Sequence, residues 1–416
     1  MKFNSYFLLA SPFFLLVHLF NLNLFVGLYL MNSTYIPLFI SMLFFISFWL
    51  IKENGHLAIS RPLLIVLSLL VVLSVYQGFT TVANLSVHTL YVAMFIMQVG
   101  LLAILLGSDI TPPKPENFRW ILRFTIGVSV AASLVHMLVG YGRPGWVWPI
   151  NISIQELSLL ILFLALLSIS NVRRELPLLF PILILLFFRS SGKTALILFV
   201  SIPILVLLYK KSRIARIGLD NYIAIYFILF IGIAVVIATE FRLEVLTFYS
   251  SYRVDIIDAR VDFWKRLSLI VEGMAHISIS NHNLIFGTGF GYENYLSNIN
   301  SHLDNTPQLF VLTLLVYGGV SFAALYFAMI IILKAEMIRA LTADIHGRSI
   351  VVVSFAVFVT FFTTHEYFNN PFFFISMSML ILALKSRKAH LIQGPEINRS
   401  ESRPFLVDRT SSPNIS

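Results

Sequence analysis

The chain has 416 residues, of which 58% are hydrophobic and only 12% charged, and its mean hydropathy is +0.87. These values exclude an ordinary soluble domain and indicate a polytopic membrane protein. The net charge of +9 does not indicate nucleic-acid binding, because the basic residues are spread over many short connections, and the absence of cysteine excludes disulfides, thiol catalysis and Cys-ligated metals.

Apolar windows long enough to cross a bilayer recur along the chain. A helix rises about 1.5 Å per residue, so about 20 apolar residues span the hydrocarbon core, and the sequence offers about twelve such windows. We therefore expect an all-α polytopic membrane protein with about 12 transmembrane helices. The expected spans are 6–30, 34–51, 62–79, 88–107, 119–140, 152–170, 176–189, 193–209, 221–239, 307–333, 348–365 and 371–385.

The positions of Lys and Arg set the expected orientation, since cytoplasmic connections hold more of them. Alternating the spans from a cytoplasmic N-terminus puts every basic cluster on the cytoplasmic side. These clusters are Lys52 and Arg61; Lys114, Arg119 and Arg123; Arg173 and Arg174; Lys210, Lys211, Arg213 and Arg216; Lys334, Arg339 and Arg348; and Lys385, Arg387 and Lys388. Both termini are then cytoplasmic, and the first span is not followed by a cleavage site.

One long polar stretch interrupts the apolar windows. Residues 240–306 form a large extracytoplasmic loop between helices 9 and 10, within a transmembrane domain of residues 1–389. Residues 390–416 are expected to be a disordered cytoplasmic tail. Basic residues kept on the face that normally avoids positive charge indicate an anionic ligand, so we expect the chemistry to take place in this loop.

The connection Ser190–Thr194 joins two of the expected helices on the extracytoplasmic face. It lacks the first glycine of a phosphate-binding P-loop, since Phe187 stands at that position. Two readings stay open. Arg189 and Lys193 either snorkel as ordinary helix-end cations or, because the preceding helix is short, lie near headgroup depth and line a polar cavity.

The outer loop holds the other candidate cations. Arg260 and Trp264 fall in a stretch that could form a surface helix, so Arg260 either contacts lipid phosphates or holds a pyrophosphate with its planar guanidinium. Arg253 and Arg266 are candidate supporting cations. The run Gly287–Gly291 lacks the context of a dinucleotide fingerprint, and we favour a structural turn over direct ligand contact.

The histidines divide into two groups. His18, His88 and His136 lie in or beside apolar windows and are expected to serve packing or interhelical hydrogen bonding, while His276 and His282 lack a spacing that would make them zinc ligands. His302 differs, because it ends the outer loop just before the next helix. An imidazole there can accept a proton from a hydroxyl group, and Asp304 is placed to orient it.

The chain resembles the O-antigen ligase and polymerase superfamily of bacterial integral membrane glycosyltransferases. The resemblance covers residues 175 to 335 and rests on elements that occur in the family's order: Ser191–Leu196, Ala259–Trp264, Leu284–Gly291, Ser301-His302 and Tyr317–Gly319. The chain departs from the family's pattern in having Leu303 where asparagine often follows the histidine. It also has Lys193 where an arginine often stands.

The resemblance implies a bacterial inner-membrane enzyme that polymerises undecaprenyl-pyrophosphate-linked oligosaccharide repeats into a surface polysaccharide. In that reading His302 is catalytic, and Arg260, Lys193 and Arg189 bind the pyrophosphate. No metal or cofactor is needed, and the partners are the lipid-linked oligosaccharide, membrane lipids, a chain-length regulator and a flippase. The alternatives are an O-antigen ligase acting on lipid A core, a transporter or flippase of polysaccharide precursors, and a non-catalytic scaffold.

Overall fold

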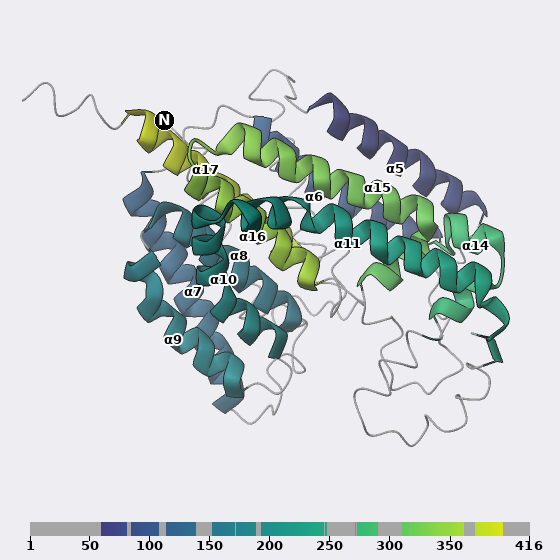
Figure 1. The fold of residues 1–416 in the computed structure, drawn as a ribbon, viewed down its shortest axis with the longest axis horizontal. Coiled ribbons are helices and arrows are strands. Elements are labelled where there is room, and N and C mark those ends of the chain that lie inside the picture. The colour runs from purple at the N-terminus through teal and green to yellow at the C-terminus, as the bar shows by residue number, and fades with distance from the viewer. Residues whose placement is uncertain are drawn as a thin grey trace, which may run out of the picture.

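The computed structural model describes residues 60–80, 85–107, 114–138, 152–170, 172–188, 193–244, 246–247, 271, 273–289, 310–361 and 371–393. Within these ranges the chain is almost entirely helical, and they contain no strand (Figure 1). The fold class expected from hydropathy is therefore confirmed as all-α. The expected spans near 6–30 and 34–51 lie outside the described residues, as does the tail from 394 onward.

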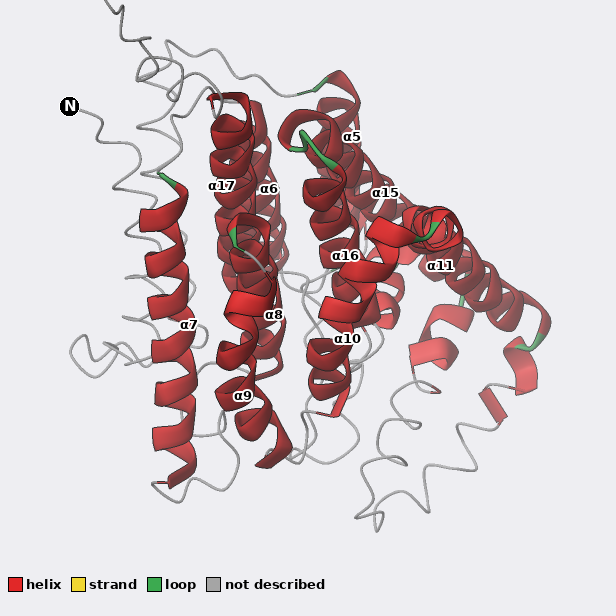
Figure 2. Cartoon of the chain, turned by 60° about the vertical axis from the view of Figure 1, so that its left-hand side comes forward, coloured by secondary structure: helices red, strands yellow, loops and turns green. Residues whose placement is uncertain are grey.

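The described helices follow the expected order of spans. Those before the loop of residues 240–306, which we call the outer segment, are α5 (Arg61–Thr80), α6 (Leu85–Gly107), α7 (Pro115–Leu138), α8 (Ile152–Ile169), α9 (Val172–Phe188), α10 (Lys193–Lys211) and α11 (Arg213–Glu240). The remainder are α14 (Asn281–Phe286), α15 (Phe310–Leu341), α16 (Ile345–Phe361) and α17 (Pro371–Gln393). In Figure 2, α7, α17, α6 and α8 run side by side along a common direction.

Three stretches of the described helices are long and apolar enough to cross a membrane: Arg61–Thr80, Arg213–Glu240 and Leu314–Leu341. Shorter apolar stretches occur at Gln98–Gly107, Leu157–Ile169 and Ile345–Phe361. Exposed large apolar side chains on α5 and α11 suit contact with lipid rather than water. A membrane protein is thus supported, while the number of twelve spans stays a prediction.

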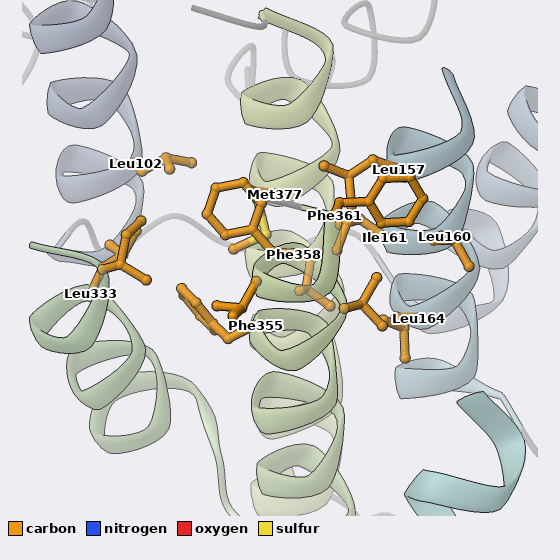
Figure 3. Close-up of a cluster of buried hydrophobic side chains, with 14 of the residues drawn as sticks. Leu102, Leu157, Leu160, Ile161, Leu164, Leu333, Phe355, Phe358, Phe361 and Met377 are labelled. Carbon is orange, nitrogen blue, oxygen red and sulfur yellow. The ribbon is translucent and has the colours of Figure 1, made fainter. Parts of the chain in front are cut away.

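Helix α8 lies at the centre of the bundle. It packs against α7, α10, α16 and α17, and every residue from Leu157 to Ser168 is buried. A helix that is apolar on all sides is stable only when other elements surround it. Figure 3 shows its leucines meeting aromatic side chains of α16 such as Phe358, with Met377 of α17 beside them.

Polar side chains tie several helix ends together at one end of the bundle. Arg387 of α17 binds Asp344, between α15 and α16, and also donates to the backbone oxygen of Ser168 in the last turn of α8. Arg348 of α16 binds Asp220 of α11, whose other carboxylate oxygen accepts a hydrogen bond from the hydroxyl group of Tyr209 in α10. We call this the basic end; it joins the C-terminal ends of α8, α10, α15 and α17 to the starts of α11 and α16.

The basic end gathers three of the six basic clusters that hydropathy alternation assigns to one side, those around Lys210, Lys334 and Arg387. The helices α10, α11, α15, α16 and α17 therefore alternate in direction, as successive membrane spans do. Because α10 and α15 both end here, their first residues lie toward the opposite end, which we call the outer end. That the outer end faces the extracytoplasmic side is part of the function proposed below.

Several helices extend past the apolar windows. Helix α17 continues past the expected limit of 385 to Gln393. Residues 390–393, which are expected from the sequence to belong to the disordered tail, are therefore helical. Arg387 and Lys388 explain this extension, since they bond to Asp344 and to the backbone oxygen of Ala340 and keep the last turns packed. Hydropathy ends a window at the first cation, whereas the helix continues while such partners remain.

Candidate functional site

The predicted site residues fall mostly outside the part of the chain that the structure describes. Arg189, Arg253, Arg260, Arg266, His302 and Asp304 all lie there. Lys193 is the first residue of α10, but its side chain is not among those described. Their convergence on one pocket therefore stays a prediction, and the described residues show instead how the outer segment is anchored.

Residues 273–289 of the outer segment pack on the beginning of α15. Residues 273–278 are helical and largely buried, and the Cα of Gly273 lies so close to α15 that a Cβ added there would be 2.9 Å from Cδ2 of Leu312. Helix α14 follows, with Ser280 as its N-cap accepting from the backbone N–H of Asn283. Figure 1 shows α14 beside one end of α15.

The glycine turn after α14 bonds to a break in α15. The backbone N–H groups of Thr288 and Gly289 donate to the carbonyl oxygens of Val316, at 3.0 Å, and Tyr317, at 2.8 Å. Gly319 interrupts the helix there with φ 66° and ψ −177°. The turn thus supplies donors to two carbonyl groups in the turn of helix that precedes the break, as buried backbone in an apolar surrounding requires.

Two glycines make this contact possible. Gly287 has φ 71°, and a Cβ on it would lie 2.4 Å from the carbonyl oxygen of Tyr317. A Cβ on Gly319 would lie 2.4 Å from the carbonyl oxygen of Ile285. Within the described part of the run, at Gly287 and Gly289, the expected structural turn is confirmed, because its backbone packs against backbone.

Gln77 of α5 completes the junction, and sequence reasoning missed it. Its side chain is fully buried, and Nε2 donates toward the carbonyl oxygens of Phe286, Tyr317 and Gly318. We define the junction seat as Gln77, Gly287–Gly289 and Val316–Gly319. The available signal was a carboxamide inside an otherwise apolar helix, since such a polar group inside a membrane span needs partners.

Aromatic rings surround the seat where α5 meets α14. The ring of Tyr76 lies 4.8 Å from that of Phe286, and the ring of His282 lies 5.2 Å from Phe286, measured between centroids. Burial lowers the pKa of nearby His276, which favours the neutral form of its ring. Among the residues that the structure describes, no group of three His, Asp or Glu side chains suits a metal ion.

His88 behaves as expected of a histidine within a span. It is buried in α6, and its Nε2 donates to the backbone oxygen of Ser74 in α5 at 2.8 Å. The ring therefore links two helices, and the interhelical role is confirmed for His88. The side chain of His136 and the whole of His18 lie outside the described residues.

The charged groups of the basic end form structural pairs rather than a reactive cluster. Asp344 receives Arg387 and also caps α16 by accepting from the backbone N–H of Gly347 at 2.9 Å. Burial alone would raise the pKa of Asp344, but these donors hold it below its usual value, so the group stays ionised. At the basic end, the carboxylates of Asp220 and Asp344 are thus each bound by an arginine.

The seat and the start of α10 share the outer end of the bundle. Val316 lies in the second turn of α15 and Lys193 in the first turn of α10, and both helices end at the basic end. The seat fixes the chain between the predicted positions of Arg260 and His302. It therefore anchors the segment between these two positions to α5 and α15.

No family model matches the chain, and no curated protein or solved structure matches it either.

Proposed function

We propose that the protein polymerises undecaprenyl-pyrophosphate-linked oligosaccharide repeats into a surface polysaccharide in a bacterial inner membrane. One observation carries the proposal furthest. Two elements of the sequence resemblance, Leu284–Gly289 and Tyr317–Gly319, are in direct backbone contact although they are about 30 residues apart. Only glycine fits at Gly287 and at Gly319, because a Cβ on either residue would lie 2.4 Å from a backbone oxygen. The contact therefore explains why each of the two sequence elements contains a glycine at that position.

The proposed reaction is an inverting glycosyl transfer. Arg260, Lys193 and Arg189 bind the pyrophosphate of the donor, where negative charge grows as the bond from sugar C1 to the phosphate oxygen breaks. His302 accepts the proton of the attacking hydroxyl group, and that oxygen forms the new bond to C1 from the opposite face. Undecaprenyl pyrophosphate leaves with the bonding electron pair, and Asp304 orients His302.

The anchored outer segment supports this assignment of roles. The predicted positions of Arg260 and His302 flank the seat in sequence, with residues 273–289 between them. Pinning the middle of the segment to α5 and α15 limits how far its two flanks can separate. A transition state needs cations and base at fixed positions, so a rigid anchor suits catalysis better than a free loop.

Reconstitution tests the function directly. Purified protein in liposomes is given labelled lipid-linked repeats alone, and products are separated by length. Chains longer than one repeat are expected. Product only after addition of lipid A core would assign a ligase instead, while labelled repeats that cross the bilayer unchanged would assign a transporter.

Single substitutions test the residue roles in the same assay. Arg260→Ala and His302→Ala are each expected to abolish product without preventing membrane insertion. The matched control is Arg339→Ala at the basic end, whose guanidinium is exposed and pairs with Glu336. Full activity in either loop variant would remove that residue from the mechanism.

A further inference from the structure

Gln77 contacts two separate parts of the outer end at once. Its Nε2 lies 3.4 Å from the carbonyl oxygen of Tyr317, 3.2 Å from that of Gly318, and within bonding distance of that of Phe286. The first two belong to the break in α15, and the third ends α14. A single side chain of α5 therefore holds the outer segment and the broken helix together.

The chemistry at this point requires a hydrogen-bond donor. Carbonyl oxygens only accept hydrogen bonds, so the group facing three of them must carry N–H or O–H. The carboxamide of Gln77 offers two hydrogens to these acceptors, and a carboxylate would be repelled by all of them. An apolar side chain would fill the space, but it would offer no hydrogen-bond donor to the carbonyl groups of Phe286 and Gly318.

The position of the seat connects this contact to the predicted base of the reaction. The first half of α15, from Phe310 to Gly318, follows the predicted base His302 by eight residues of sequence. Gln77 binds the last residues of that half-helix. A shift of the half-helix would move the chain that carries His302, whereas the longer path back to Arg260 would absorb more of the movement.

We propose that Gln77 is a positioning residue for the transfer reaction, fixing the half-helix Phe310–Gly318 against α14 so that the base side of the site is aligned. The inference rests on the proposed function for its reaction. It adds a role for a residue of α5, far from the outer segment in sequence. It also predicts that alignment of the acceptor hydroxyl, rather than binding of the donor, depends on this carboxamide.

The kinetic test compares Gln77→Ala with the wild-type protein in the polymerisation assay. We expect kcat to fall by about tenfold to a hundredfold, because small misplacements of a catalytic group have effects of that size. The KM for the lipid-linked donor should change by less than about twofold, since donor binding is not removed. Gln98→Ala is the matched control, because it deletes another buried carboxamide, in α6, that is not one of the residues of the seat.

A second variant, Gln77→Glu, separates hydrogen bonding from packing, because a loss of packing alone would not make the relative activity depend on pH. In Gln77→Glu the carboxyl group can donate only when protonated, so its activity relative to wild type at the same pH should rise as the pH falls. The same ratio for Gln77→Ala should stay flat. Equal ratios at every pH for Gln77→Glu would overturn the assignment of a hydrogen-bond donor.

A cross-linking readout separates this inference from the proposed function. The chain has no cysteine, so a Tyr76→Cys and Phe286→Cys pair reports on α5 and α14 alone, at a place where the two rings are 4.8 Å apart. Adding Gln77→Ala should slow cross-linking severalfold whether or not the protein polymerises glycans. Unchanged cross-linking, or an unchanged kcat in a folded and active protein, would overturn the inference. A wild-type protein that cross-links but makes no polymer would refute only the proposed function.

Discussion

Gly287 and Gly319 meet backbone to backbone, and each adopts a positive φ, 71° and 66° respectively. The contact is reciprocal. A Cβ on Gly287 would lie 2.4 Å from the carbonyl oxygen of Tyr317, and a Cβ on Gly319 would lie 2.4 Å from that of Ile285. No side chain larger than hydrogen fits on either side. The outer segment and α15 are therefore joined at a place where sequence variation is sterically limited.

Replacing either glycine is expected to destabilise the protein. In Gly287→Ala or Gly319→Ala the new Cβ meets backbone that has no room to move, and the positive φ adds strain of about 1 to 3 kcal/mol per residue. Thermal unfolding in detergent should show a lower midpoint for both variants. Gly232→Ala is the control: a Cβ there meets nothing within 4 Å, and alanine in a helix should be neutral or stabilising.

The seat also shows where sequence reasoning reaches its limit. The glycine run after Phe286 was readable as a turn, because glycine permits positive φ, but its partner was not. Tyr317–Gly319 lies within an apolar window, so hydropathy predicts one unbroken span over 307–333, although the pair Gly318-Gly319 is itself a signal for a break. Gln77 stands out locally as a carboxamide within an apolar window, but its partner was not predictable, because a contact between residues 241 apart in sequence has no local pattern.

Helix positions were easier to predict than helix ends. The window 62–79 agrees with α5 to within one residue at each end, because apolar length alone decides both limits there. By contrast α11 starts at Arg213, eight residues before the expected 221, because Arg216 and Asp220 find partners at the basic end. The candidate cations and His302 lie outside the described residues, so their arrangement stays a prediction.

Arg387 is expected to be the most important cation of the basic end. Arg387→Ala removes donors to Asp344 and to the backbone oxygen of Ser168, and should destabilise by about 1.5 to 3 kcal/mol, the usual range for hydrogen bonds to charged groups. Chemical unfolding in detergent measures this. Arg339→Ala should change stability by less than about 1 kcal/mol, because its pair with Glu336 is exposed. Equal losses in the two variants would contradict this ranking.

Acid should weaken the same junction through Asp344. Burial works against its ionised form, but Arg387 and the N–H of Gly347 lower the pKa below its usual value. A lowered pKa means that the stabilisation is complete above the ordinary value of about 3.9 and is lost as the pH falls through the folded-state value. The stability difference between wild type and Asp344→Ala should therefore shrink below about pH 4, and a constant difference would exclude this carboxylate as its source.

The pair of Arg123 in α7 and Glu175 in α9 should behave differently when broken and when replaced. Glu175 is buried, and the guanidinium contacts both of its oxygens at 2.7 and 2.9 Å. Glu175→Ala leaves a half-buried cation without its counter-charge and should destabilise by about 2 kcal/mol, below the range for fully buried pairs. The double variant Arg123→Leu with Glu175→Leu should recover most of that loss in an unfolding assay, and failure to recover would show that the charges contribute net stability.

The orientation of the bundle can be tested by labelling, because the chain lacks cysteine and every introduced thiol reports alone. Arg339→Cys marks the basic end and Ile279→Cys marks the outer segment, and both native side chains are exposed. Because cytoplasmic connections retain positive charge, the basic end should face the cytoplasm. A membrane-impermeant maleimide should then label Ile279→Cys in spheroplasts and Arg339→Cys only in inverted vesicles.

The reverse labelling pattern would move the seat to the cytoplasmic side, where it could not serve a reaction in the outer leaflet. Labelling of both thiols from the same side would contradict the alternation of helix direction that links α10, α11 and α15. Arg387→Cys would be a poor choice of marker, because that side chain holds α17 to Asp344 and its loss would perturb the end being mapped. Arg339 and Ile279 avoid this difficulty, since neither belongs to the seat or to the bonds that join the helix ends.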